Sequence, residues 1–187
     1  FTFANILFYT VSGKLPVGIM AVVMAFTPIF TYVISLIARI DRVVLMRVIG
    51  ILMGFAGVLL IVVPKSSLPD PALGFWVLVG FVVPLMHGLG YVVLDESNRP
   101  AGSDSIGLAA GTLYTNALMT FVLIMIFGEF QWLTWPLSAA EIAMMTHATL
   151  AGFNFYAMFE LIRIAGPTYM SQSSSLAVGF GVFYGIV

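Results

Sequence analysis

Two histidines stand inside long apolar stretches of this sequence, each with another polar side chain on the same helical face. His87 is followed four residues later by Tyr91, and His147 is followed seven residues later by Asn154. Both spacings place the paired side chains on one side of an α-helix. Because imidazole can bind a polar solute and exchange protons near neutral pH, the pairs predict a polar binding surface, with protons as a candidate coupling ion. A buried histidine with satisfied hydrogen bonds is the competing interpretation.

Other polar and aromatic side chains also lie within apolar stretches. Polar groups are costly at the depth of a bilayer, so those in the middle of a membrane-spanning helix are default candidates for a functional site. The predicted lining of a central polar cavity is His87, Tyr91, Tyr114, Asn116, His147, Asn154, Tyr156 and Gln172. Hydrogen bonds that hold helices together, each contributing ~0.6 kcal/mol, explain residues such as Asn116 equally well.

The sequence lacks the common motifs of enzyme active sites. It has no cysteine, so thiolate metal sites and cysteine nucleophiles are excluded. The H-E-x-x-H, G-x-S-x-G and P-loop motifs are absent as well. We therefore predict no catalytic residue, no cofactor and no metal. An intramembrane enzyme using His87 and His147, or a structural or receptor-like helical bundle, is the alternative to a transporter.

The composition points to a membrane protein. Of 187 residues, 61% are hydrophobic and only 8% are charged, whereas soluble domains have about 25% charged residues. A net charge of -1 gives no basic face for nucleic acid. The expected partners are therefore the lipid bilayer and a small organic solute, and nothing in the sequence specifies an oligomeric state.

Apolar windows of membrane-spanning length follow one another along the chain. A helix needs about 20 apolar residues to cross the hydrocarbon core. The windows are 15–38, 43–64, 73–94, 106–128, 140–164 and 168–187, after a shorter one at 1–11. Strands are not expected, because the apolar runs lack a period of two and lipid tolerates only helices or closed barrels. The sequence therefore predicts an all-α, polytopic membrane bundle whose first and last helices are incomplete.

The charged residues between the windows predict an orientation. With alternating spans, five arginines fall on one side of the membrane and two lysines fall on the other. The first group is Arg39, Arg42, Arg47, Arg99 and Arg163, and the second is Lys14 and Lys65. The positive-inside rule then places the junctions at 39–42, 95–105 and 163–167 in the cytoplasm.

A proline-rich linker divides the chain. Pro64, Pro69 and Pro71 interrupt any helix between 64 and 71. A shift of 151 residues superposes Pro16 on Pro167, and the two prolines fall on opposite sides of the membrane. This faint repeat is therefore inverted, as in many secondary transporters. The predicted division is 1–64, a linker at 65–72, and 73–187.

The stretch from 28 to 63 resembles a known family. Pro28 lies in the middle of a span, Asp41-Arg42 follows, and the glycine-rich segment GILMGFAGVLL occupies 50–60. This pattern resembles the drug/metabolite transporter superfamily in its EamA-like branch, which has the same interval between the acidic residue and the first glycine.

The resemblance implies a permease of the bacterial inner membrane with ten helices in two inverted five-helix repeats. Residues 1–64 would be the C-terminal part of the first EamA-like repeat, and 73–187 would be the second repeat without its last helix. Such a protein moves small organic solutes by alternating access.

Glycines and prolines within the spans have predicted structural roles. Small residues four apart allow close helix packing, and this role is expected for Gly50, Gly54, Gly57, Gly107 and Gly111. Pro28 and Pro84 are expected to break or loosen their helices and to act in gating.

The predicted orientation can be tested by labelling single cysteines, because the natural chain has none. In Ser67→Cys the thiol should react with an impermeant reagent added to intact cells, and in Ala101→Cys it should react only after permeabilisation. Labelling of Ala101→Cys but not Ser67→Cys in intact cells would contradict the orientation.

Overall fold

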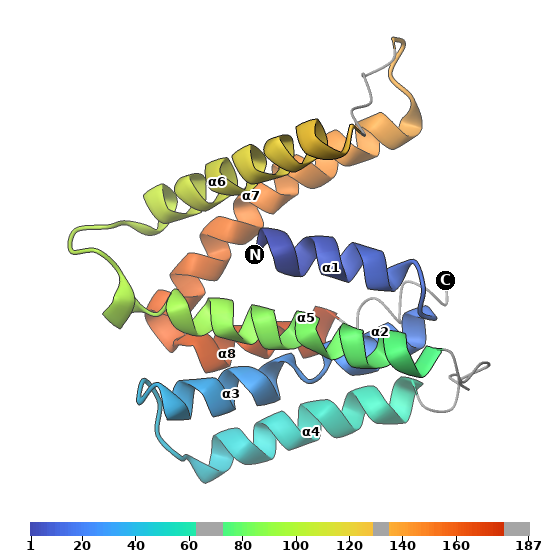
Figure 1. The fold of residues 1–187 in the computed structure, drawn as a ribbon. Coiled ribbons are helices and arrows are strands. Elements are labelled where there is room, and N and C mark those ends of the chain that lie inside the picture. Colours follow the sequence, from blue (N-terminus) through green and yellow to red (C-terminus); the bar gives the residue numbers. More distant parts are fainter. Residues whose placement is uncertain (63–72, 129–134, 178–187) are drawn as a thin grey trace. The chain divides into compact units, whose positions relative to one another are not determined.

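The computed structural model describes residues 1–62, 73–128 and 135–177, and all regular structure in these ranges is helical. The elements are α1 (Thr2–Ser12), α2 (Val17–Met24), α3 (Thr27–Ile37), α4 (Leu45–Val62), α5 (Leu73–Val93), the 3-10 turn η2 (Glu96–Asn98), α6 (Ser105–Phe127), α7 (Ala139–Ala165) and α8 (Pro167–Ser171) (Figure 1). The predicted all-α class is confirmed. The predicted linker at 65–72 and half of the last window, residues 178–187, lie outside the described residues.

Within the described residues, three helical segments are long and apolar enough to cross a membrane: Val17–Ile37, Leu73–Val93 and Ser105–Phe127. A shorter apolar stretch in α4 covers Leu45–Gly57. α7 forms over the predicted window 140–164 but is not among the three segments. The spans expected over 43–64, 140–164 and 168–187 therefore stay predictions, as does the ten-helix inverted repeat.

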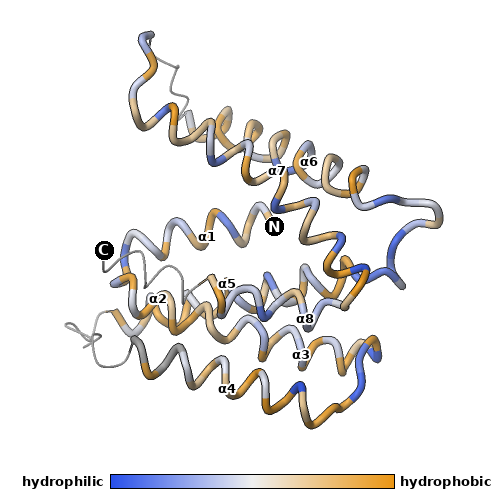
Figure 2. Tube along the Cα trace, turned by 180° about the vertical axis from the view of Figure 1, so that it is seen from behind, coloured by the Kyte–Doolittle hydropathy of each residue, from blue (hydrophilic) through white to orange (hydrophobic). Residues whose placement is uncertain are grey.

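The described helices fall into two compact units. The first unit is built from Phe1, Phe3–Asn98 and the segment that begins at Ile162, and the second contains Arg99–Leu161. In the first unit, α3 lies between α4 and α5 in both views (Figures 1 and 2). The division into repeats at 1–64 and 73–187 rests on sequence similarity and not on contacts between residues. It stays a prediction.

The apolar core of the first unit lies where α5 meets α1 and α2. Its buried side chains are Val11, Leu15, Ile19, Met20 and Val83. α5 approaches closely at Gly80, where a Cβ atom would lie 3.4 Å from Val11 Cγ1 and 3.6 Å from Val23 Cγ1. A small residue at this point therefore lets α5 contact two neighbouring helices at once.

The closest contact between α3 and α5 is at Gly88. A Cβ atom there would lie 3.0 Å from both the backbone nitrogen and the hydroxyl oxygen of Thr31. The obstacle is partly backbone, which a rotamer change cannot move. A side chain at residue 88 would therefore force the α3 backbone to move by a few tenths of an ångström.

The first candidate span is not one continuous helix. α2 ends at Met24 and α3 begins at Thr27, with Pro28 in its first turn. Proline has no N–H to donate to the carbonyl four residues earlier, which belongs to Met24. The Thr27 hydroxyl donates to that carbonyl instead, at 2.7 Å. The interruption expected at Pro28 is therefore observed, together with the side chain that compensates for it.

No comparable interruption occurs at Pro84. α5 runs as one α-helix from Leu73 to Val93 with Pro84 inside it, so no break is observed here, and the loosening and gating roles of Pro84 stay predictions. Pro84 is buried, and packing against neighbouring helices allows a membrane helix to keep its course through a proline.

Three junctions that the sequence assigns to one side of the membrane lie at one end of the first unit. The Thr168 hydroxyl, just after the α7–α8 junction, donates to Asp41 in the α3–α4 loop. Arg39 and Asp95 line the same pocket. The hydrophilic segments after α3 and after α5 are visible in Figure 2. The alternation of spans across a membrane stays a prediction.

The second unit pairs α6 with α7, and polar groups define the helix ends. The Asp104 carboxylate accepts from the Gly107 N–H at 2.8 Å and caps α6. Ser138 and Glu141 form a reciprocal capping box at the start of α7, with bonds of 2.6 and 3.3 Å. The Ser105 hydroxyl donates to Glu160 at 2.7 Å and connects the two helices.

The glycines predicted to pack helices occupy varied surroundings. In the part of the chain that the structure describes, nothing lies within 4 Å of a Cβ atom built on Gly50, Gly57 or Gly111. Gly54 faces Ser175 at 3.5 Å, and Gly107 faces the Asp104 carboxylate of its own helix cap. The packing role of these glycines stays a prediction, whereas close approach is observed at Gly80 and Gly88.

Gly88→Ala should lower the thermal stability of the purified protein, because the added methyl group meets the Thr31 backbone. Overpacking of this kind costs about 1–3 kcal/mol. Gly74→Ala is the matched control in the same helix, since nothing lies within 4 Å of its Cβ position. Equal unfolding temperatures for the two variants in detergent would contradict the proposed close contact.

Candidate functional site

His87 and Tyr91 lie side by side on α5, as their spacing predicts. Their ring centroids are 6.4 Å apart, and the Phe1 ring lies 6.0 Å from His87 and 5.9 Å from Tyr91. Phe1 fits here because Gly90 has no side chain: a Cβ atom there would lie 3.0 Å from the tip of the Phe1 ring. The result is a cluster of rings in the first unit.

The hydrogen bonds of this cluster define the tautomer of His87. His87 Nδ1 lies 3.1 Å from the Val83 carbonyl. A carbonyl only accepts, so Nδ1 carries the proton, and in the neutral ring Nε2 is then the acceptor. Tyr91 is buried and interacts with the Ser174 side chain. Gln172, at the C-terminal cap of α8, is half-buried.

The other predicted lining residues belong to the second unit. Tyr114 is 74% exposed, and His147 and Asn154 are also exposed, whereas Asn116 is half-buried. Tyr156 lines a shallow apolar pocket of about 380 Å³ between α6 and α7. The eight residues are thus divided between two units, and a single cavity bordered by all of them stays a prediction.

A set of buried hydroxyl groups in the first unit was missed by the sequence analysis. α3 packs against α5 and α8, and the buried hydroxyl residues on these helices, here called the hydroxyl seam, are Thr27, Thr31, Ser35, Thr168 and Ser171. The signal was present, because the first three recur at four-residue intervals, as Thr112, Asn116 and Thr120 do.

Two of the five hydroxyls of the seam bond to the backbone of their own helix. Thr31 donates to the Thr27 carbonyl at 2.8 Å, and Ser171 donates to the Thr168 carbonyl at 2.7 Å. Ser35 Oγ is fully buried and has no hydrogen-bond partner among the described residues. A buried polar atom without a partner is uncommon and marks a position where a polar ligand or water can bind.

Asp41 joins the α3–α4 loop to α8. One carboxylate oxygen accepts from the Arg42 N–H at 2.8 Å and forms an ion pair with Arg47, and the other accepts from the Thr168 hydroxyl at 2.9 Å. The side chain of Asp41 is only 12% exposed. Both oxygens are therefore bonded, and residues 127 positions apart are connected.

Tyr32 also holds the loop between α3 and α4. Its hydroxyl accepts from the Val44 N–H at 3.0 Å and donates to the Arg42 carbonyl at 3.2 Å. The loop between α3 and α4 is thus held by side chains on both sides. The Asp41-Arg42 pair that carries part of the family resemblance has a structural role here.

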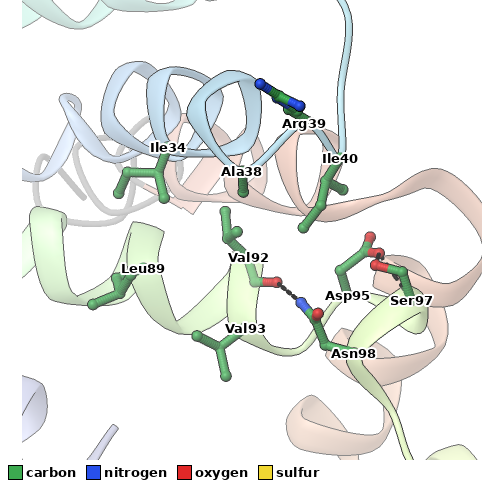
Figure 3. Close-up of a pocket in the computed structure, with 10 residues that line it drawn as sticks. All are labelled: Ile34, Ala38, Arg39, Ile40, Leu89, Val92, Val93, Asp95, Ser97 and Asn98. Carbon is green, nitrogen blue, oxygen red and sulfur yellow. Dashed lines mark hydrogen bonds between the residues drawn. The ribbon is translucent and has the colours of Figure 1, made fainter.

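A pocket of about 600 Å³ opens between the C-terminal ends of α3 and α5, within the first unit (Figure 3). Its apolar wall is formed by Ile34 on α3 and by Leu89, Val92 and Val93 on α5. Figure 3 shows Arg39 on the α3 side and Asp95, Ser97 and Asn98 together on the other side.

The polar groups of this pocket are held by short-range hydrogen bonds. Asp95 Oδ1 accepts from the N–H and the hydroxyl of Ser97, at 3.0 and 2.6 Å. The Asn98 amide donates to the Val92 carbonyl at 3.1 Å and covers the end of α5. Arg39 has no side-chain interaction with the other described residues.

Arg39 adopts a left-handed backbone conformation, with φ of 59°. The N–H groups of Arg39 and Ile40 donate to the carbonyls of Leu36 and Ser35, at 3.1 and 3.0 Å. These two bonds define a Schellman motif, in which glycine usually occupies the left-handed position. α3 therefore ends on an arginine whose backbone conformation is unfavourable for a residue with a side chain.

The described residues contain no group of three or more His, Cys, Asp or Glu side chains that could hold a metal ion.

Comparison of the chain with protein-family models, with curated protein sequences and with solved structures finds no significant match.

The Asp41 interactions should contribute measurably to stability. Asp41→Asn removes the charge that pairs with Arg47, and hydrogen bonds to charged groups contribute about 1.5–3 kcal/mol. Asp104→Asn is the matched control, because asparagine caps a helix about as well as aspartate. Asp41→Asn should lower the unfolding temperature in detergent, and Asp104→Asn should leave it nearly unchanged. The same small change in both would contradict a role for Asp41 in joining the loop to α8.

Proposed function

We propose that this chain belongs to a multi-pass membrane transporter that moves a small organic solute by alternating access. The observation that carries the proposal is the interrupted span at Val17–Ile37. Broken helices at membrane depth occur where backbone is buried in protein or lines a cavity. In secondary transporters such helices form the substrate site near the middle of the membrane.

The interruption between α2 and α3 is enclosed by packed side chains. Ala25, between α2 and α3, is buried. The Phe26 ring packs edge-on against Phe55 of α4 at 4.7 Å and Phe81 of α5 at 4.8 Å. A helix that is already divided can change its angle at the division without losing further backbone hydrogen bonds. We therefore place a hinge between Met24 and Thr27.

The hydroxyl seam provides polar groups next to the hinge. Thr27 belongs to both, since its hydroxyl bonds to the Met24 carbonyl and its position begins the row that leads to Ser35. We propose that the solute pathway runs past the His87–Tyr91 ring cluster and the seam. The remaining residues of the proposed lining are Tyr114, Asn116, His147, Asn154, Tyr156 and Gln172.

Asp41 has a natural place in such a cycle. Its bond to Thr168 connects the end of α3 with the start of α8, and these elements belong to different halves of the proposed inverted repeat. A transporter needs contacts at each end of the pathway that form in one state and break in the other. We assign this role to the Asp41–Thr168 contact at the proposed cytoplasmic end. Location in the bacterial inner membrane rests on the family resemblance.

The proposal is tested in cells that express the full reading frame containing this chain. A metabolite accumulation or resistance screen identifies the solute, and Thr27→Val is then compared with the parent protein. Valine keeps the shape of threonine but leaves the Met24 carbonyl without its bond. Transport should fall about tenfold at equal membrane abundance, since an unmet hydrogen bond in a buried site costs about 1–3 kcal/mol.

Thr115→Val is the matched control, because Thr115 makes the same kind of bond, 2.8 Å long, within the unbroken helix α6. It should transport normally. In the same assay, full transport by both His87→Ala and Asn154→Ala would refute the proposed lining. Chemical conversion of the solute in place of its movement would refute the transporter and favour an enzyme.

A further inference from the structure

We propose that the pocket between the C-terminal ends of α3 and α5 binds the headgroup of a zwitterionic phospholipid with a primary ammonium group, such as phosphoethanolamine. This inference does not depend on transport. It depends on the depth of the pocket, on the charges at its rim and on the apolar surface that leads from it.

The pocket lies at the depth of lipid headgroups. Two of the candidate spans end at its border, at Ile37 and at Val93. Residues directly beyond the end of a spanning helix lie in the interfacial region, where phosphate groups are found. The volume of about 600 Å³ falls within the range of roughly 300–1,000 Å³ that is usual for small-molecule sites.

Arg39 supplies the group that binds phosphate. Its guanidinium has no partner among the described side chains. Figure 3 shows it turned away from the space between α3 and α5, so a rotamer change brings it to a ligand there without breaking an interaction. Guanidinium groups bind phosphate through two parallel hydrogen bonds, and this geometry makes arginine the preferred residue for the task.

Asp95 supplies the complementary charge. One of its carboxylate oxygens is bonded to Ser97, which fixes the orientation of the side chain. A carboxylate at the rim repels a lipid whose headgroup carries only negative charge. It attracts a headgroup that carries an ammonium group, and a primary ammonium can also donate a hydrogen bond. The two charges together therefore select a zwitterion over phosphatidylglycerol, and a hydrogen-bonding ammonium over choline.

The apolar wall provides a path for an acyl chain. Leu89 is 52% exposed and Val93 is 59% exposed, and both line the pocket. Ile37, at the end of α3, is 76% exposed. These side chains face outward along the last turns of two spans, where they would contact hydrocarbon. A free, water-soluble zwitterion would leave this wall uncovered, so the structure favours a lipid.

The test measures which lipids stay bound to the protein expressed from its full reading frame. The purified protein is exchanged into detergent micelles containing equal amounts of phosphatidylethanolamine, phosphatidylglycerol and phosphatidylcholine, and retained lipid is counted by native mass spectrometry. Phosphatidylethanolamine should be retained preferentially. Arg39→Gln should reduce its retention about tenfold, as expected for loss of a charge-assisted pair of hydrogen bonds, and Arg39→Lys should restore part of it.

Two further variants separate this site from general surface charge. Arg42→Gln changes the charge of the same loop by the same amount but lies outside the pocket lining, and it should leave retention unchanged. Asp95→Asn keeps an oxygen acceptor for Ser97, so it should fold normally and lose the preference for phosphatidylethanolamine over phosphatidylglycerol.

Equal effects of Arg39→Gln and Arg42→Gln, or an unchanged lipid preference in Asp95→Asn, would overturn the proposal. Glycerophosphoethanolamine, which has the headgroup without acyl chains, should compete poorly. If it displaced the lipid as well as intact phosphatidylethanolamine does, the ligand would be a free solute and the lipid site would be refuted.

Discussion

The organisation of the first unit depends on the absence of one side chain. At Gly88 the backbone of α3 approaches α5 so closely that a Cβ atom would lie 3.0 Å from the Thr31 nitrogen. Most buried residues of α3 are small threonine, serine and proline residues, and Tyr32 is the large side chain among them. The small hydroxyl residues of the seam are compatible with this close packing. Small hydroxyl residues are suited to such contacts in membrane proteins, because they pack tightly and satisfy their own polar atoms on the helix backbone.

The helix is interrupted where α3 begins. Pro28 removes one backbone hydrogen bond, and the Thr27 hydroxyl donates to the Met24 carbonyl in its place. The Met24 carbonyl therefore keeps a hydrogen-bond donor. α5 carries Pro84 without interruption, which shows that proline alone does not decide where a span divides. At Pro28 the neighbouring rings Phe26, Phe55 and Phe81 occupy the space around the bend. Local chemistry and tertiary packing together determine the position of the division.

The sequence predicted the helices well and the contacts poorly, for a physical reason. Apolar windows reflect the thickness of the membrane, so their bounds follow from composition, and α5 over Leu73–Val93 matches the window 73–94 closely. Contacts depend on which face of a helix meets a neighbour. Gly50 and Gly54 have the familiar four-residue spacing, but the close contact between α3 and α5 is at Gly88, which has no glycine four residues away. His87 and Tyr91 were paired correctly because they share one helix. Ser35 was missed because its burial depends on α3 packing against α5 and α8, which no local pattern records.

The end of α3 is a site of local frustration. Helix termination by a Schellman motif favours glycine in the left-handed position, and any other residue there adds a penalty of roughly 1–2 kcal/mol. Arg39 occupies this position all the same, and the motif is held by the N–H groups that donate to Leu36 and Ser35. A glycine would make this helix end more stable and would also remove the positive charge. Glycine at position 39 would favour helix stability, and arginine provides a positive charge. This chain has the arginine.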